Sequence, residues 1–581
     1  MKQLLIYLKD YKKETILAPL FKLLEASFEL MIPLVVAAIV DRGIGQNEIG
    51  YVYKMGGAMV LLGIVGLIAA VSAQFFAAKA AVGFATGLRS ALFKHIQSLS
   101  YTEIDTAGTS TLITRLTSDV NQVQSGVNMT LRLLLRSPFI VFGAMIMAFT
   151  VDVKAALIFV GVIPLLCLVV FGIMLITMPL YKQVQKHLDR VLTLTRENLT
   201  GIRVIRAFHQ EKEEIEKFES GNEELTKTQL LVGKISALTN PITYVIINLG
   251  LVVLIYTGAM QVDAGRLTQG QVIALINYIS QILVELIKMA NLIVLITKAL
   301  SSANRISDVF ATKSTMDDKG TASVEEEENV SILEFENVGL CYAGAGEESL
   351  SEIDFSVNKG ETVGIIGGTG CGKTSLVNLI PRFYDATSGM IRFYGKPIRE
   401  YSLEELRNRI GVVPQKAVLF KGTIKSNLLW GNEDASLEEM NEALETAQAK
   451  EFVDQLDQGL ESSVAQGGKN FSGGQRQRLT IARALVRKPE ILILDDSTSA
   501  LDYATDAKLR AKLKEMKNTM TTFIVSQRTS SIQFADKIIV LEDGKIAGIG
   551  THKYLLEHCE VYQEIYDSQY QNPVEEVAAD E

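Results

Sequence analysis

Residues 489–496 read Pro-Glu-Ile-Leu-Ile-Leu-Asp-Asp, an unbroken aliphatic run that ends in two acids. A strand in which no polar residues alternate with the apolar ones is buried on both faces, as in the parallel sheet of an α/β domain. Its terminal Asp495 is then placed where a carboxylate can hold Mg²⁺ beside substrate phosphates. This pattern is typical of the Walker B strand of nucleotide-hydrolysing domains.

A glycine-rich segment upstream supports the same interpretation. Residues 367–374 read Gly-Gly-Thr-Gly-Cys-Gly-Lys-Thr, after an expected strand at 362–366 and before a helical pattern. In a loop of the form G-x-x-x-x-G-K-[ST], backbone N–H groups and a helix N-terminus face phosphate oxygens. We expect Lys373 to reach the β- and γ-phosphates of ATP and Thr374 to offer its hydroxyl to Mg²⁺. The predicted nucleotide-binding residues here are Gly367, Gly368, Thr369, Gly370, Cys371, Gly372, Lys373, Thr374 and Ser375.

A second glycine nest occupies residues 471–478, Phe-Ser-Gly-Gly-Gln-Arg-Gln-Arg. It opens a helix whose dipole favours anions, yet one nucleotide site needs no second nest of its own. At this motif the chain resembles the ATP-binding cassette (ABC) transporters, whose signature engages the ATP held by the opposite subunit. The resemblance covers essentially the whole chain, because six spanning helices followed by one cassette is the plan of an exporter-type half-transporter.

The resemblance implies roles for further residues. Tyr342 would stack on adenine, Gln415 would sense Mg²⁺ and the attacking water, and the loop that ends at Asp502 would cross the dimer interface. The residues expected to meet the partner's nucleotide are Ser472, Gly473, Gly474 and Gln475. The expected Mg²⁺ ligands are Thr374, Gln415 and Asp495.

Two positions depart from the family's catalytic pattern. Asp496 stands where a Glu would orient the attacking water, and Gln527 stands where a His is expected. An Asp arm is shorter by about 1.5 Å, one C–C bond, and a misplacement of that order can cost about 10²-fold in rate. Gln donates a hydrogen bond but cannot become cationic as His can. We therefore expect ATP binding with poor hydrolysis; family drift with normal turnover is the alternative.

This asymmetry predicts a partner. A homodimer would contain two impaired sites, whereas a second half-transporter with Glu and His at these positions would form one good site with Ser472 of this chain. We therefore expect a heterodimer in which hydrolysis takes place mainly at the site that the partner completes. The two catalytic candidates of this chain, Asp496 and Gln527, would act together with Gln415.

Composition indicates a membrane protein. The chain has 581 residues, of which 48% are apolar and 21% charged, and a span of the bilayer needs about 20 apolar residues. The net charge of −9 argues against nucleic acid as the partner. The expected spans are about 16–40, 55–78, 133–150, 155–178, 242–262 and 272–296.

The expected organisation follows from these spans. An all-α transmembrane domain covers 1–315, an acidic linker 316–330, an α/β nucleotide-binding domain with a mainly parallel sheet 331–565, and an acidic tail 566–581. Basic residues concentrate at the N-terminus and in the long loops, which places both termini on the cytoplasmic side of a bacterial cell membrane. Segments 101–108 and 205–212 in these loops are the expected contacts with a cytosolic domain; the alternative is that each long loop is an ordinary solvated helical hairpin.

Charged residues inside the spans leave two interpretations open. Lys22, Glu25 and Glu29 share one face of the first span, and Glu285 and Lys288 lie one turn apart in the sixth. They line a hydrated path for cationic, amphipathic substrates, or they pair with one another inside the bundle.

Export of hydrophobic or amphipathic drugs is the leading functional interpretation, with the lipid bilayer as the surroundings. The alternatives are a lipid or peptide exporter, and an ATP-gated channel or regulatory membrane protein that uses nucleotide only as a ligand. Turnover-dependent transport would distinguish a pump from a channel.

Overall fold

The computed structural model describes residues 4–318, 320, 322 and 330–570. Two compact units divide the chain: Met1–Gln97 with Ser110–Thr312, and Ser98–Thr109 with Lys313–Glu581. The short segment Ser98–Thr109 therefore groups with the C-terminal unit, although it interrupts the helices of the first. Most of the expected linker 316–330, and residues 571–581 of the expected tail, lie outside the described residues.

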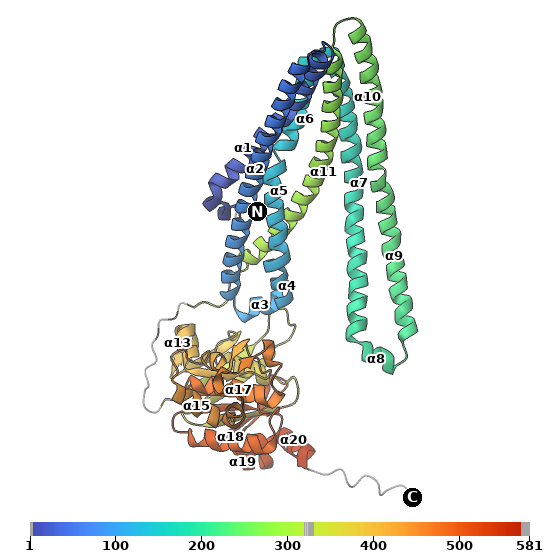
Figure 1. Cartoon of the computed structure of the whole chain (residues 1–581). Coiled ribbons are helices and arrows are strands. Elements are labelled where there is room, and N and C mark those ends of the chain that lie inside the picture. Colours follow the sequence, from blue (N-terminus) through green and yellow to red (C-terminus); the bar gives the residue numbers. More distant parts are fainter. Residues whose placement is uncertain (1–3, 319, 321, 323–329, 571–581) are drawn as a thin grey trace. The chain divides into compact units, whose positions relative to one another are not determined.

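The first unit is helical throughout (Figure 1). Six of its helical segments are long and apolar enough to cross a membrane, as the sequence predicts: Leu4–Ile44, Ile49–Gln97, Thr109–Val151, Val153–Thr200, Glu211–Asp263 and Gln269–Ala311. All six extend well past the roughly 20 residues that a bilayer requires. The third is interrupted by a turn at Leu134–Leu135, inside the span expected at 133–150.

The six segments comprise η1 (Leu4–Tyr11), α1 (Lys12–Ala38), η2 (Ile39–Ile44), α2 (Ile49–Gln97), α4 (Thr109–Thr114), η3 (Arg115–Asp119), α5 (Val120–Leu133), α6 (Arg136–Val151), α7 (Val153–Thr200), α9 (Glu211–Ala237), α10 (Thr239–Asp263) and α11 (Gln269–Ala311). The short helix α8 (Ile202–Ala207) connects α7 to α9. Helix α7 packs along α9 and α10, while α11 packs on α1, α5 and α6 (Figure 1). Small residues such as Ala73 and Ala77 of α2 are fully buried, which allows close helix approach.

The charged residues of the spans pair with one another, the second of the two interpretations that the sequence leaves open. Arg136, at the start of α6, donates to Glu285 of α11 and to Glu29 of α1, each at 2.7 Å. Lys288 donates to Glu285 at 2.8 Å, and Lys22 donates to Glu25 at 2.5 Å. Glu285 is only 2% exposed, and Arg136 and Lys288 balance its charge inside the helical bundle. Arg136, the hub of this network, is absent from the residues that the sequence singles out.

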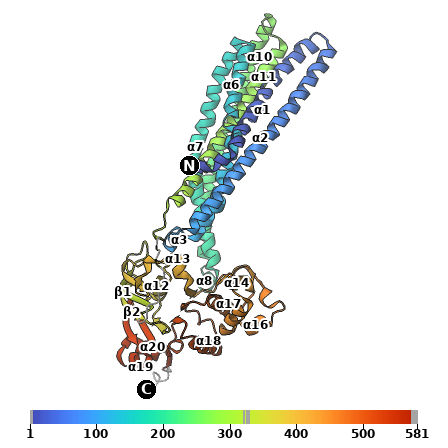
Figure 2. The same ribbon diagram turned by 90° about the vertical axis from the view of Figure 1, so that its left-hand side faces the viewer.

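The second unit contains a mixed α/β domain, as expected. Its six-stranded sheet has the order β12-β11-β3-β10-β9-β6, parallel except for β12. A four-stranded antiparallel sheet has the order β2-β1-β4-β5. Figure 2 shows α14, α16 and α17 in a lobe apart from β1 and β2.

The strands are β1 (Leu333–Leu340), β2 (Leu350–Val357), β3 (Thr362–Gly367), β4 (Ser388–Phe393), β5 (Lys396–Pro397), β6 (Ile410–Val413), β7 (Gly422–Thr423), β8 (Ser463–Val464), β9 (Ile491–Asp495), β10 (Thr521–Val525), β11 (Lys537–Glu542) and β12 (Lys545–Gly550). The α-helices are α3 (Tyr101–Ala107), α12 (Lys373–Leu379), α13 (Leu403–Asn408), α14 (Ile424–Leu428), α15 (Leu437–Thr446), α16 (Lys450–Asp454), α17 (Gly473–Val486), α18 (Tyr503–Glu515), α19 (His552–His558) and α20 (Glu560–Tyr570). Short 3₁₀ turns are η4 (Ile398–Glu400), η5 (Gly459–Glu461), η6 (Gln466–Gly468) and η7 (Thr529–Ser531).

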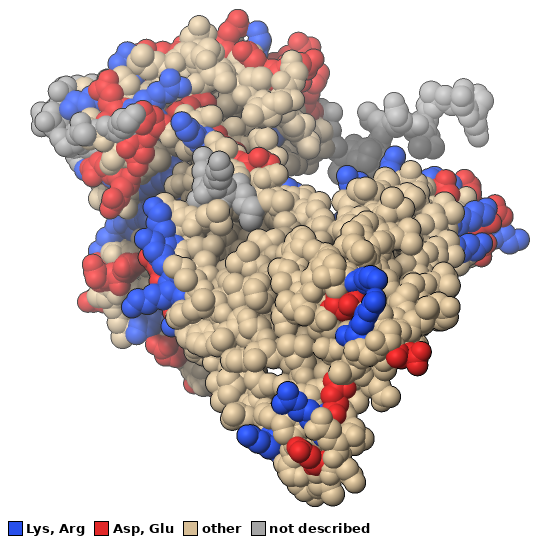
Figure 3. Space-filling model, turned by 90° about the horizontal axis from the view of Figure 1, so that it is seen from above, with Lys and Arg blue, Asp and Glu red and all other residues tan. Residues whose placement is uncertain are grey.

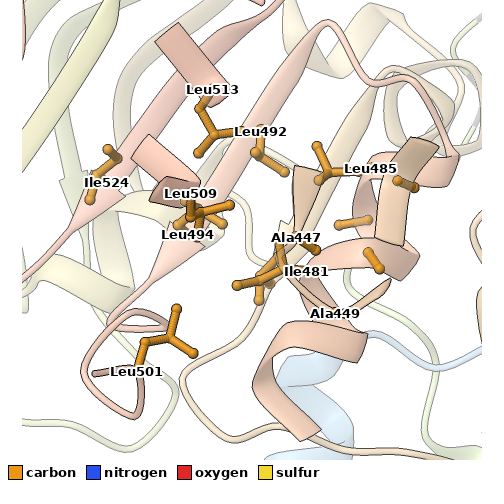
Figure 4. Close-up of a cluster of buried hydrophobic side chains, with 14 of the residues drawn as sticks. Ala447, Ala449, Ile481, Leu485, Leu492, Leu494, Leu501, Leu509, Leu513 and Ile524 are labelled. Carbon is orange, nitrogen blue, oxygen red and sulfur yellow. The ribbon is translucent and has the colours of Figure 1, made fainter. Parts of the chain in front are cut away.

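Strand β9 is buried along its whole length, which accounts for its aliphatic run. On one face Leu492 and Leu494 join a core with Ile481 of α17 and Leu509 of α18 (Figure 4). On the other face Ile491 and Ile493 belong to a separate core, shared with β1 and β3. Burial of both faces holds the carboxyl end of β9 rigidly beside that of its parallel neighbour β10.

Candidate nucleotide-binding site

The glycine-rich loop joins β3 to α12 in the expected strand–loop–helix arrangement. Gly372, which immediately precedes α12, has a φ of 96°, a left-handed conformation that favours glycine. A Cβ at this position would lie 2.8 Å from the carbonyl oxygen of Ser349, so close approach also requires glycine. Lys373 folds back over the loop, and its Nζ donates to the carbonyls of Gly367 at 2.9 Å and Gly368 at 2.6 Å. The basic group is therefore held within the curl of the loop.

Asp495 ends β9 beside this loop. The Thr374 hydroxyl donates to Oδ1 of Asp495 at 3.2 Å, which joins the first turn of α12 to the end of the strand. Asp495 is 5% exposed, and this burial, reinforced by neighbouring Asp496, raises the pKa of its carboxyl above the ordinary value despite the Thr374 hydrogen bond. A cation would relieve the cost of keeping this carboxylate charged.

The donor set suits Mg²⁺ held mainly by a nucleotide. Within residues 4–318, 320, 322 and 330–570, no three or more His, Cys, Asp or Glu side chains are grouped to hold a metal. Thr374 and Asp495 offer hard oxygen ligands, and Mg²⁺ usually binds one or two protein oxygens together with waters and substrate phosphates. The residues therefore fit an ion that arrives with a phosphate chain.

Asp496 lies at the edge of the same cavity. Its backbone N–H donates to the carbonyl of Val525 at 3.1 Å, and its φ of 44° is left-handed, a conformation that Asp tolerates better than most residues. Nε2 of Gln415 donates to Oδ2 of Asp496 at 3.3 Å. The structure thus brings together two of the three residues predicted to act on the attacking water.

Gln527, the third of these residues, lines the cavity from the loop after β10. Its carbonyl accepts a hydrogen bond from Nε2 of Gln569 at 2.8 Å, and Oε1 of Gln569 accepts from both N–H and hydroxyl of Thr529. Helix α20, which contains Gln569, therefore anchors this loop. The helix ends at Tyr570, five residues beyond the domain end expected at residue 565.

The cavity measures about 690 Å³. Predicted residues among those that line it are Thr369, Gly370, Gly372, Lys373, Thr374, Ser375, Gln415, Asp495, Asp496 and Gln527. Residues that the sequence analysis missed also line it: Glu347, Glu348, Ser349, Val525, Asp543 and Gly544. Asp543 and Gly544 form the tight turn between β11 and β12, both at positive φ. The Asp-Gly pair is a hairpin signal, but only the pairing of β11 with β3 brings it to the loop.

Tyr342 lies beside this cavity and is half buried. Its hydroxyl donates to Oγ of Ser375, one of the lining residues, at 3.0 Å. Its ring meets that of Tyr384 edge-on, with centroids 5.0 Å apart. The ring thus packs partly against the core and remains adjacent to the phosphate-binding loop.

The second glycine nest lies elsewhere on the unit. Ser472 caps α17 in a reciprocal capping box with Gln475, with distances of 2.9 and 3.3 Å. Ser472 and Gly473 are exposed, and none of residues 472–475 is among those that line the cavity. Gly474 lies close to the loop before Asp502, since a Cβ there would stand 3.3 Å from the carbonyl of Ala500. Asp502 itself caps α18 by accepting from the backbone N–H of Thr505 at 2.9 Å.

Comparisons with known proteins agree with both units. Residues 15–286 match the family model "ABC transporter transmembrane region", and residues 350–499 match "ABC transporter". The chain is 37% identical to the uncharacterized ABC transporter ATP-binding protein YfiB of Bacillus subtilis, covering 98% of this chain and 99% of that protein. It is 32% identical to the putative multidrug export ATP-binding/permease protein YgaD of Bacillus subtilis, covering 98% and 100%.

Two further relatives extend the comparison. The ATP-dependent lipid A-core flippase of Hahella chejuensis is 31% identical and is matched over 88% of each chain. A solved structure of a bacterial Atm1-family ABC exporter with ATP bound has a TM-score of 0.79 at 23% identity, covering 97% of this chain and 99% of that chain. At this level of identity, the similarity to the Atm1-family exporter shows a shared fold alone.

Proposed function

The chain belongs to the ABC transporters as an exporter-type half-transporter, and on that premise we propose that it is one subunit of a heterodimeric pump for drugs or other amphipathic compounds. The proposed subunit binds ATP at a site of its own that hydrolyses it slowly. It also supplies its signature motif to a faster site completed by the partner. Hydrolysis at the partner's site then drives the transport cycle.

One observation supports this proposal: Asp496 lines the cavity beside the predicted Mg²⁺ ligand Asp495. It follows Asp495 directly and accepts a hydrogen bond from Gln415 at 3.3 Å. Its arm is one methylene shorter than that of Glu, and Gln527 on the same cavity cannot become cationic. Both changes weaken the electrostatic stabilisation of phosphoryl transfer, whereas the loop that binds phosphates keeps its geometry.

In the proposed site, Lys373 releases the loop carbonyls to meet phosphate oxygens, and backbone N–H groups of residues 368–374 complete the cradle. Thr374, Asp495 and Gln415 would hold Mg²⁺, which neutralises charge on the phosphates when bound. Tyr342 would stack on the adenine ring. Gln415 would sense Mg²⁺ and the attacking water and transmit their presence to the membrane unit.

The signature supports a shared arrangement of sites. Because Ser472 and Gly473 are exposed and do not line this chain's own cavity, the Ser472 hydroxyl and the Gly473 N–H suit an anion presented by another molecule. The 14-residue helix α17 adds its dipole to those donors. A chain that combines an intact signature with an impaired catalytic site is expected to be the non-hydrolysing member of a pair.

The membrane unit supports an amphipathic substrate and a second subunit. Its helices expose many large apolar side chains, for example Leu168 of α7 (72%) and Val252 of α10 (63%). Figure 3 shows a broad tan face on which charged side chains are few. Such a surface suits lipid and a neighbouring subunit. The name of YgaD favours drugs, and the lipid A-core flippase keeps lipid export as the second candidate.

The proposed orientation has both termini and both long helical loops in the cytoplasm of a bacterial cell. Segments 101–108 and 205–212 would then carry the closure of ATP-loaded cassettes to the spans. Hydrolysis at the partner's site would reset the transporter, so that ATP turnover and outward movement of substrate are coupled.

Transport assays with the full-length chain test this function. The chain is expressed alone and together with each half-transporter of the same organism that carries the Glu and His, and inverted vesicles are supplied with ATP and a panel of cationic dyes. We expect ATP-dependent dye uptake only in the co-expressed vesicles. Rapid uptake with this chain alone would overturn the heterodimer, and passive ion conductance under a non-hydrolysable nucleotide would favour a channel.

A further inference from the structure

We propose that Tyr384 is a positioning residue that transmits occupancy of the adenine position to helix α3. The proposal rests on the proposed function only in that ATP binds at this site. It concerns contacts within the second unit, to which α3 belongs. Hydrolysis rate and subunit composition do not enter it.

The first contact joins Tyr384 to the expected adenine platform. The rings of Tyr342 and Tyr384 are nearly perpendicular, at 89°, with centroids 5.0 Å apart. Edge-to-face packing of this kind is directional and contributes about 0.5–1.5 kcal/mol beyond burial. Tyr342 is also fixed to the first turn of α12 through its hydrogen bond to Ser375. The orientation of Tyr384 therefore depends on that of Tyr342.

The second contact joins Tyr384 to α3. Its hydroxyl donates to Oδ2 of Asp105 at 2.5 Å. The ring of Tyr101, in the first turn of α3, packs on Phe383 with centroids 4.8 Å apart and on Tyr384 with centroids 6.0 Å apart. Burial and the adjacent Asp105 raise the pKa of Tyr384, so the hydroxyl remains a donor at physiological pH.

The support of this aromatic cluster is rigid on the cassette side. The guanidinium of Arg407 lies over the ring of Phe383, 5.4 Å from its centroid, and donates to the carbonyls of Pro381 and Arg382. The turn that presents Phe383 and Tyr384 is therefore fixed to α13. A change in the orientation of the Tyr384 ring therefore mainly affects its two neighbours, Tyr342 and α3.

Helix α3 is also fixed at its N-terminus. Glu103 is 7% exposed, accepts from the backbone N–H of Ser100 at 3.0 Å, and accepts from the N–H and hydroxyl of Thr315 at 3.1 and 2.8 Å. Asp105, two residues further along, accepts a hydrogen bond from Tyr384. Glu103 thus fixes α3 to the segment around Thr315, while Tyr101 and Asp105 connect the helix to the aromatic cluster beside the expected base platform.

Chain connectivity gives this arrangement a consequence. Helix α2 ends at Gln97 and α4 begins at Thr109, so α3 is the link between two long membrane-unit segments. A base stacked on Tyr342 would restrict that ring, and through Tyr384 it would restrict the Asp105 end of α3. The membrane unit would then register whether the base position is filled, even where hydrolysis is slow.

Hydrogen–deuterium exchange on the full-length chain in lipid nanodiscs tests the proposal with two probes. MgATP fills the phosphate loop and the base position, whereas magnesium tripolyphosphate fills only the loop. Protection of the peptide that contains 367–375 reports loop occupancy for both. We expect ATP to slow exchange in the 98–109 peptide by about fivefold, the size expected of one hydrogen bond, and tripolyphosphate to leave it unchanged.

Variants separate positioning from folding. Tyr384→Ala should abolish the ATP effect on 98–109 while 367–375 stays protected, and Tyr384→Phe, which keeps the ring, should retain part of it. Asp105→Ala removes the same hydrogen bond from the α3 side and keeps both tyrosine rings, so it should likewise retain only part of the effect, without altering the cassette. Tyr554→Ala removes a half-exposed ring of α19 and should behave like the unaltered chain. Equal protection by both probes, or full protection in Asp105→Ala, would overturn the proposal.

Discussion

Lengthening one side chain should restore hydrolysis at this site. In the proposed mechanism Asp496 falls short of the attacking water by about 1.5 Å. Such a displacement corresponds to about 10²-fold in rate, or about 2.7 kcal/mol in the barrier. Asp496→Glu recovers this reach, and Gln527→His adds a group that can carry positive charge near the γ-phosphate.

The local backbone reduces the expected gain. Asp496 has a φ of 44°, and the left-handed region suits Asp better than Glu. A longer arm must also displace or rotate Gln415, whose Nε2 lies 3.3 Å from the present carboxylate. We therefore expect the double substitution to raise ATP turnover by about 10- to 10²-fold.

Phosphate release by the full-length chain in lipid nanodiscs at saturating MgATP measures this gain. Lys373→Ala, introduced into both backgrounds, removes the phosphate-binding lysine and defines the rate that does not come from this site. Asp496→Asn should lower the original rate by less than about twofold, because a carboxylate that contributes little has little to lose. A loss of about 10²-fold in Asp496→Asn, or no gain in the double variant, would refute the reasoning.

Three further outcomes are expected. Arg136→Met should destabilise the membrane unit by about 1–3 kcal/mol in chemical unfolding, because buried Glu285 loses one of its two charged partners and keeps only Lys288. Arg136→Met/Glu285→Leu should recover part of this loss. Equal stability of the single variant and the original would contradict the ion network. Ser472→Ala should lower ATPase activity of the assembled transporter more than Asp496→Asn does, and the reverse order would place the working site in this chain. Burial alone would raise the pKa of Glu103, but hydrogen bonds from Ser100 and Thr315 outweigh burial and hold this pKa below its ordinary value. The contribution of Glu103 to stability is therefore present at neutral pH and is lost as pH falls through the lowered pKa. In Glu103→Gln the acid-induced loss of thermal stability should shrink, and an unchanged pH profile would exclude this role.

The sequence predicts most of the secondary structure that positions the site because the signals are local. Continuous aliphatic residues at 491–494 indicate a doubly buried strand, and the loop at 367–374 is defined by its own glycines. Hydropathy alone identifies the six apolar segments, since the bilayer imposes their length.

What the sequence could not reveal depends on contacts between distant segments. Arg136 resembles a flanking residue at the edge of a span, and only the packing of α6 on α1 and α11 turns it into the hub of an ion network. Asp543 signals a hairpin but not its place beside the phosphate loop. Tyr384 and Asp105 are 279 positions apart, so neither local sequence predicts their hydrogen bond.

The most direct test follows the γ-phosphate in this chain's own site. The transporter, purified intact from membranes, is incubated with 8-azido-ATP labelled at either the α- or the γ-phosphate and then cross-linked by light. A subunit that holds nucleotide without splitting it should retain both labels equally over many turnovers of the complex. Loss of the γ-label from this chain as fast as from its partner would contradict the account.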